Sequence, residues 1–417
     1  MHRVRIVRLL APVASLAVLA TLSTPSKAQA PISLTEALRL AEVSQPLPKA
    51  ASARVEAAEA RVRLAGKQAN PTLALARPYG SALTGGFGED IIVSQAFEPG
   101  GVLGPRKRAA QHQQQVAQAE RSAAGLDLRR TVTVAYTECL RAEGEVAQAK
   151  AALEATQRFA DAAKVQFMAG DAPRSNVVRS QIESARFSQT LLQATTDRDN
   201  RYATLRSLIG LPPTTPLVLA DMLSPKPALM SLVVAKAHAL SHLPEILTAR
   251  AQVLASAADV DSAKGQRLPS VVIEGRRANL NPGQVGPASI RVGVSLPLFD
   301  NGRIQADVRA GESAKRGQEF QLKEVERVAL LEVEMAVREY EQAQSIVASF
   351  EGDGRLTKVK ELLEMAQIGY EKGGTGYLEV IDAQRVFASE QVEYVRALAS
   401  LRVATARLER AIGGPLL

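Results

Sequence analysis

Apolar and small residues recur every seven positions over long stretches of the chain. In the first half one heptad column is Val132, Cys139, Val146, Leu153, Ala160 and Phe167, and a column of smaller residues runs beside it from Ala135 to Gly170. Two such columns form a seam along one helix face, and the small column lets partner helices approach closely. At about 1.5 Å per residue, a helix over 132–170 is roughly 60 Å long. The pattern therefore predicts long coiled-coil helices.

Short stretches between these helices change to a period of two. Ile290, Val292, Val294, Leu296 and Leu298 alternate with small or polar residues, and the segment 89–97 alternates less cleanly. Each segment follows an earlier strand candidate across a glycine-rich loop, which predicts β-hairpins at about 71–98 and 269–298. Four strands with an apolar outer face cannot close a barrel alone, and open edges in lipid leave backbone groups unpaired. We therefore expect the chain to oligomerise around an axis.

The second half of the chain repeats the first. Gly170 aligns with Gly373, Val177 with Val380, Gln181 with Gln384, and Ile209-Gly210 with Ile412-Gly413, without a gap. This match predicts an internal duplication. We expect repeats over 31–213 and 231–417, joined by a proline-rich connector at 214–230. In each repeat the long helices reverse at a glycine turn, at about 170–175 and 373–378.

The first thirty residues have the pattern of a secretory signal peptide. Arg3, Arg5 and Arg8 precede an apolar run, and Ala28-Gln29-Ala30 fits a small-x-small cleavage site. We expect 1–30 to be removed on export. The lone cysteine lies far from this site, so neither a disulfide framework nor a lipid on an N-terminal cysteine is expected. No later segment approaches about eighteen uninterrupted apolar residues, so we expect a periplasmic, extracellular or outer membrane protein.

Composition narrows the class of protein further. The chain is 46% hydrophobic but only 4% aromatic and contains no tryptophan, a balance that suits alanine-rich helices better than a compact enzyme core. Part of its net charge of +8 lies in the signal segment. The remaining positive excess is modest, so we expect no nucleic-acid partner.

Few residues point to chemistry. The spacing of His238, His242 and Glu245 could place three metal ligands on one helical face, but Pro244 disfavours a helix there. Cys139 occupies the heptad seam, which predicts a small buried thiol. The segment 104–108, "GPRKR", lacks the ending of a phosphate loop and fits a basic helix start near anionic lipid headgroups. We therefore predict no catalytic residue, no metal site and no cofactor, and hence no enzyme.

The passages from strand to helix resemble those of a known family. They read "VSQAFEPGG" over 93–101 and "VSLPLFDNGR" over 294–303, with Asn70-Pro71 before the first strand and "GTGYLEVIDAQR" over 374–385. In their order and duplication these motifs resemble the TolC-type outer membrane factor family, and within it the heavy-metal-efflux branch of the CzcC and CusC type. The resemblance covers essentially the whole mature chain.

This resemblance implies a mainly α fold with a small β part. Four strands per subunit would join a transmembrane β-barrel shared by a homotrimer, and long antiparallel helices would form a periplasmic α-barrel. The expected function is the outer membrane channel of a tripartite efflux system, exporting heavy-metal cations. The expected partners are a periplasmic adaptor (a membrane fusion protein), an inner-membrane pump of the RND type and outer membrane lipid. Drug efflux, type I secretion and a periplasmic coiled-coil adaptor or scaffold are the alternatives.

The same resemblance assigns roles to the glycine turns. Gly170, Asp171 and Ala172 in the first repeat, and Gly373, Gly374 and Thr375 in the second, would be the periplasmic tips that meet the adaptor. Asp382 matches an acidic residue near the constricted end of the tunnel. Arg179 occupies the matching position in the first repeat, so we expect these two residues to line the aperture, where an opposite-charge pair could close it.

Overall fold

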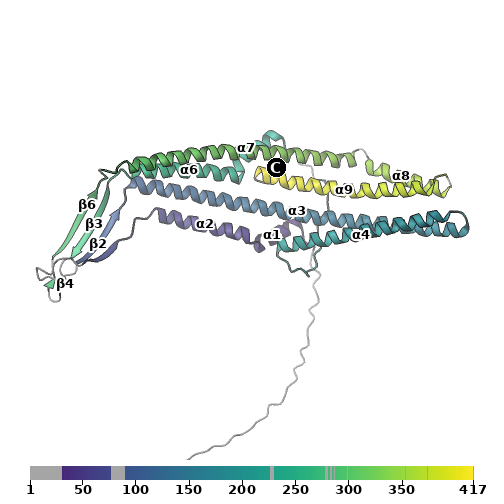
Figure 1. The fold of residues 1–417 in the computed structure, drawn as a ribbon, viewed down its shortest axis with the longest axis horizontal. Coiled ribbons are helices and arrows are strands. Elements are labelled where there is room, and N and C mark those ends of the chain that lie inside the picture. Colours follow the sequence, from purple (N-terminus) through teal and green to yellow (C-terminus); the bar gives the residue numbers. More distant parts are fainter. Residues whose placement is uncertain are drawn as a thin grey trace, which may run out of the picture.

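The computed structural model shows an elongated molecule with a sheet at one end and helical turns at the other (Figure 1). It describes residues 31–76, 90–225, 230–277, 280–281, 284–285, 287–297, 299–352, 354–372 and 374–416. The predicted signal peptide, 1–30, lies outside the described residues, as does Gly373 of the second glycine turn.

Long helices make up most of the described chain. They are α1 (Leu34–Ser44), α2 (Pro46–Ala65), α3 (Gly100–Ala169), α4 (Arg174–Ile209), α5 (Leu232–His242), α6 (Pro244–Gly265), α7 (Arg303–Glu351), α8 (Arg355–Glu371) and α9 (Tyr377–Ile412). Helix α3 alone has 70 residues and so extends the predicted seam as far as the sheet. None of the described helices combines the length and the apolar composition needed to cross a membrane.

Equivalent helices of the two halves begin and end in the same way. Ser33 before α1 and Ser231 before α5 each accept a hydrogen bond from a first-turn N–H. Such a cap satisfies a donor that the helix itself leaves unpaired. Helices α4 and α9 both end at a glycine in the left-handed region, Gly210 and Gly413. Other residues rarely adopt this conformation, so glycine allows the chain to leave the helix here.

Four strands form one antiparallel sheet in the order β1 (Thr72–Ala76), β2 (Asp90–Phe97), β3 (Ser270–Arg277) and β6 (Ala288–Ser295). The pairing of β2 with β3 joins the two halves of the chain. Two short strands, β4 (Leu280–Asn281) and β5 (Gln284–Val285), pair with each other. In the described sheet, β1 and β6 have a neighbour on one side only.

The register places apolar side chains on one face of this sheet. Ile273 of β3 lies opposite Val292 of β6, and Val93 of β2 lies opposite Leu73 of β1. This face exposes Leu73, Leu75, Val93, Phe97, Ile273, Ile290, Val292 and Val294. The opposite face carries the ion pair of Arg276 with Asp90 and the hydrogen bond between Thr72 and Ser94, beside a few apolar side chains such as Ile92. One apolar and one polar face are the requirements of a wall between lipid and water.

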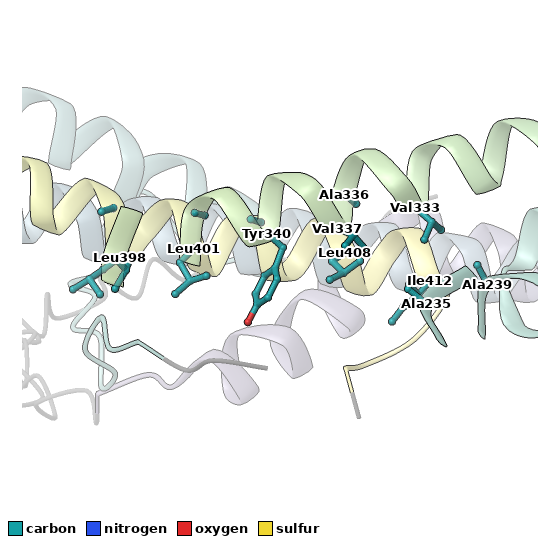
Figure 2. Packing of buried hydrophobic residues seen from close by; sticks show 14 of the residues in the cluster. Ala235, Ala239, Val333, Ala336, Val337, Tyr340, Leu398, Leu401, Leu408 and Ile412 are labelled. Carbon is teal, nitrogen blue, oxygen red and sulfur yellow. The ribbon is translucent and has the colours of Figure 1, made fainter. Parts of the chain in front are cut away.

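Each half packs a short helix against its long helices. In the second half Ala235 and Ala239 of α5 lie close to Val333 of α7 and to Leu408 of α9 (Figure 2). Helix α1 forms the equivalent cluster with α3 and α4 in the first half. The small alanine side chains allow the short helices to approach closely, so both halves bury their apolar seams in the same way.

Candidate functional site

Two helical turns lie at the end of the molecule that is far from the sheet (Figure 1). The first joins α3 to α4 through Gly170, Asp171 and Ala172. Gly170 adopts the left-handed conformation, with φ of 86°, and the N–H of Asp171 donates to the carbonyl of Gln166 at 2.9 Å. This closure satisfies carbonyl groups that the last helical turn leaves free.

The second turn joins α8 to α9. The N–H groups of Gly374 and Thr375 both donate to the carbonyl of Gly369, at 2.8 and 3.2 Å. The Thr375 hydroxyl donates to the carbonyl of Ala366 at 3.2 Å. A Cβ at Gly369 would lie only 2.7 Å from the Thr375 side chain, so this glycine permits the tight turn. Gly373, the remaining predicted contact, lies outside the described residues.

Polar contacts join the α3–α4 hairpin to the α8–α9 hairpin near these turns. Glu183 of α4 forms an ion pair with Arg385 of α9. The hydroxyl of Tyr370 on α8 donates to Oε1 of Gln166 on α3 at 2.5 Å. Each contact connects the first half of the chain to the second, so together they resist separation of the two hairpins.

The ion pair belongs to a polar layer inside the helical packing. The Glu183 side chain is only 8% exposed, and Ser180 is fully buried. Burial raises the pKa of the Tyr377 hydroxyl, while its hydrogen bond with Ser180 lowers it in part. The hydrogen bond to Glu183 raises the pKa of Arg385. A buried carboxylate depends on such a partner because desolvation disfavours its charge.

One buried amide oxygen of this layer has no partner among the described residues. Gln384 is 6% exposed, and its Oε1 accepts no hydrogen bond from any described residue. It lines a groove of about 370 Å³ with Phe159 of α3, Leu363 of α8 and Phe387 of α9. An unpaired buried acceptor costs about 1–3 kcal/mol. The contact between the two hairpins is therefore weakened at this point.

Both predicted aperture residues, Asp382 and Arg179, are exposed. Among the residues that the structure describes, no ion pair joins one to the other. The opposite-charge contact between the halves is made instead one helical turn further along, by Glu183 and Arg385. Sequence reasoning missed this pair, although the spacing of Glu183 from buried Ser180 places it on the packed face of α4.

The other candidate residues do not form a reactive site. His238 and His242 stack with 4.2 Å between their ring centroids, while the Glu245 carboxylate is bonded to Arg410. In the described part of the chain, no three or more His, Cys, Asp or Glu side chains are placed to hold a metal ion. Cys139 is buried in the seam, and burial raises its pKa to about 12.

An open antiparallel sheet with one exposed apolar face, continued by long paired helices, defines an outer membrane channel subunit. The profile of the family "Outer membrane efflux protein" matches residues 37–211 and 237–414, so the chain belongs to this family. It is an efflux channel protein of the outer membrane, with its helices in the periplasm. The predicted family, fold class and location are thereby confirmed. The family consists of transport channels rather than enzymes.

Individual relatives cover nearly the same length. The chain is 24% identical over 401 residues to the cobalt-zinc-cadmium resistance protein CzcC of Cupriavidus metallidurans, covering 93% of this chain and 92% of CzcC. It is 24% identical over 343 residues to the toluene efflux pump outer membrane protein TtgF of Pseudomonas putida, covering 78% and 69%. The crystal structure of CusC superimposes with a TM-score of 0.76 over 91% of this chain and 92% of that one, at 17% identity, and so has the same fold.

Proposed function

We propose that three copies of the chain assemble into the outer membrane channel of a tripartite efflux system. The observation that carries this proposal is the sheet, whose apolar face is exposed and whose edge strands β1 and β6 each lack one neighbour within the described chain. In lipid, unpaired strand edges are excluded, so β1 of one copy must pair with β6 of the next.

The size of the pore sets the smallest number of copies. Two copies would supply eight strands, and side chains fill the interior of an eight-stranded barrel. Three copies supply twelve strands, within the range of about 8 to 26 found in bacterial outer membrane barrels, and leave room for a passage. The mass of the detergent-extracted protein, measured by light scattering, tests this assembly: we expect a trimer, and a monomer or dimer contradicts it.

The helical turns are the proposed contact with a periplasmic adaptor. Gly170, Asp171 and Ala172 at one tip, and Gly373, Gly374 and Thr375 at the other, would face the adaptor, which links the channel to an inner-membrane pump of the RND type. The pump would supply the energy. Cysteines introduced at Ala172 and Thr375 should crosslink to the adaptor in cells, and their failure to capture it would remove this assignment.

The contacts between the hairpins are the proposed gate. While Glu183 holds Arg385 and Tyr370 holds Gln166, the α8–α9 hairpin stays against α3 and α4. Adaptor binding would favour the separated arrangement, which is a shift between two populations. Asp382 and Arg179 would line the aperture between neighbouring subunits, and an Arg179→Glu variant with unchanged conductance and efflux would remove that role.

Channel recordings test the gate. Tyr370→Phe should raise the ratio of open to closed channels about two- to tenfold, because one lost hydrogen bond is worth about 0.5–1.5 kcal/mol. Arg385→Gln should raise it about tenfold or more, because Arg385 donates twice to Glu183 and hydrogen bonds between charged groups are worth about 1.5–3 kcal/mol. Arg338→Gln is the matched control, since Arg338 pairs with Glu334 on the exposed surface of α7, away from the tips. Unchanged opening in both tip variants contradicts the proposed gate.

We propose heavy-metal cations as the substrate. The support is the relative CzcC, which matches nearly the whole chain, whereas the toluene pump protein TtgF matches less of it. Cells that lack their own channel can be supplied with this chain and challenged separately with cobalt, zinc, cadmium and toluene. Restored tolerance of the metals supports the proposal, and tolerance of toluene alone replaces it with solvent or drug efflux.

A further inference from the structure

The four passages between strands and helices lie together at one level of the molecule (Figure 1). Helix α2 precedes β1, β2 precedes α3, α6 precedes β3, and β6 precedes α7. At this level the apolar face of the sheet ends in a paired row of Phe97, Val271 and Val294. With the sheet placed in the outer membrane as proposed above, this row would lie at the periplasmic edge of the hydrocarbon layer.

A second set of apolar side chains lies just beyond that row. Leu64, Leu268, Leu296 and Phe299 are all exposed, and Phe299 is 94% exposed. Large apolar side chains in such positions are unfavourable in water but suit the boundary between acyl chains and headgroups. The passages therefore have the composition of a membrane interface.

Exposed basic residues accompany these apolar side chains, and four of them, Lys67, Lys107, Arg267 and Arg303, form what we call the basic collar. Three neighbouring basic residues are already paired with carboxylates: Arg106, Arg108 and Lys264. The collar residues take part in no ion pair within the described chain. Their charge is therefore available to a partner outside the subunit.

The acidic residue closest to the collar in sequence is already engaged by backbone donors. The Asp300 carboxylate accepts hydrogen bonds from the N–H groups of Ile304 and Gly302, at 2.9 and 3.1 Å, and so begins α7. Those bonds hold its pKa below the usual range, with a smaller contribution from Arg267. Asp300 thus serves the strand-to-helix turn, and the collar retains an excess of positive charge.

We propose that the basic collar binds the phosphate groups of anionic phospholipids in the periplasmic leaflet, while Phe299 and its apolar neighbours contact the acyl chains. The inference rests on the membrane placement used for the proposed function. Each Lys or Arg near an anionic surface strengthens attachment by about fivefold. The collar would fix the height and tilt of the channel in the membrane.

A tryptophan reporter tests the proposal in the full chain. The protein has no tryptophan, so Phe299→Trp gives a single tryptophan per subunit, at the predicted interface. The reporter protein is placed in vesicles containing brominated phosphatidylglycerol or, separately, brominated phosphatidylcholine. We expect quenching at low salt to show a preference for phosphatidylglycerol of about fivefold or more. Raising the salt concentration should reduce this preference, because salt screens exposed charges.

Two sets of substitutions in the reporter protein give the comparison. Replacing all four collar residues with Gln should bring the preference close to one. The control replaces four exposed, unpaired lysines of the described chain that lie away from the passages, Lys49, Lys150, Lys164 and Lys358, and should leave the preference unchanged. The proposal is overturned if the preference for phosphatidylglycerol persists in the collar variant and does not depend on the salt concentration. It is also overturned if the control variant loses the preference to the same extent as the collar variant. Absence of quenching by either lipid rejects the membrane placement as well.

Discussion

Single buried polar side chains connect distant segments of the chain through hydrogen bonds. The Tyr136 hydroxyl of α3 donates to the carbonyl of Ile32 at 2.8 Å, and the N–H of Asp221 approaches the same hydroxyl at 3.4 Å. Burial raises the pKa of Tyr136 to about 12, so the hydroxyl keeps its proton at neutral pH. One side chain thus ties the start of the first half and the connector to the longest helix.

Cys139 gives a prediction about reactivity. Its folded-state pKa is about 12, against about 8.5 for a free thiol. At pH 8 the native thiol should therefore react with a thiolate-specific reagent about a hundredfold or more slowly than the unfolded chain does. The thiol contribution to stability is complete below about pH 8.5 and is lost as the pH rises toward 12. Fast labelling of the native protein would contradict this burial.

Arg410 gives a prediction about stability. Its guanidinium is 17% exposed and bonds Asp127 of α3 and Glu245 of α6. Burial lowers its pKa, but these two carboxylates outweigh burial and raise it. We expect Arg410→Met to lower the free energy of unfolding by about 1.5–3 kcal/mol, because hydrogen bonds between charged groups are lost. Denaturant unfolding of the periplasmic helices, followed by circular dichroism, measures the change.

The control for Arg410 is an ion pair on the surface. Arg327 and Glu324 are both well exposed and lie three residues apart on α7. Arg327→Met should leave unfolding unchanged within error, since exposed pairs are solvated and screened. Equal effects of the two substitutions would show that Arg410 does not join the helices.

At the level of elements, two glycines near the sheet allow α3 and α6 to approach closely. A Cβ added to Gly265 of α6 would lie 2.0 Å from the carbonyl oxygen of Gly101 in α3. We expect Gly265→Ala to push these helices apart and to destabilise the fold by about 1–3 kcal/mol. Gly125→Ala in α3 meets nothing within 4 Å and should instead stabilise by about 0.5–1 kcal/mol. Thermal unfolding distinguishes the two outcomes, and equal shifts would contradict the close packing.

The helices and strands could be predicted because their signals are local. The heptad columns of 132–170 and the alternation of 290–298 each report which side of one element is apolar. The break between α7, which ends at Glu351, and α8, where Gly354 adopts φ of 59°, was not predicted. Gly352 and Gly354 are the local signal for this break, because glycine adopts the left-handed conformation at little cost, and α8 continues in the direction of α7 (Figure 1).

The site could be predicted only in part, for a related reason. Glycine turns are visible in the sequence, and in the structure the chain passes from α3 to α4 and from α8 to α9 near these glycines. The pairing of Glu183 with Arg385 depends on which faces of α4 and α9 meet. That relation joins residues some two hundred positions apart, and no local pattern encodes it.

At the scale of the whole molecule, one part of the chain is suited to water and another part to lipid. The helices bury small side chains in the seams between them, as expected of a structure in water. The sheet instead exposes Ile290, Val292 and Val294 on a continuous face. A single subunit in water would leave this face uncovered, which favours aggregation. We therefore expect the sheet to fold together with assembly of the subunits and insertion into the bilayer. The helical part can pack without the bilayer.

A substitution at Val292 tests whether the apolar face of the sheet contacts lipid. It lies on the apolar face of β6, beside Arg291 on the polar face. If the apolar face meets lipid, Val292→Lys should destabilise the inserted protein, because the charge must leave water. Val292 lies two residues from the edge row at Val294, so we expect a cost of about 1–2 kcal/mol, between the interfacial and the midplane values. Arg291→Lys, which keeps the charge on the polar face, should change little. Refolding of both variants into vesicles across a urea series measures their stabilities. Equal stabilities would mean that Val292 faces water rather than lipid. A clear difference would mean that the bilayer, and not only the chain, completes the fold of this sheet.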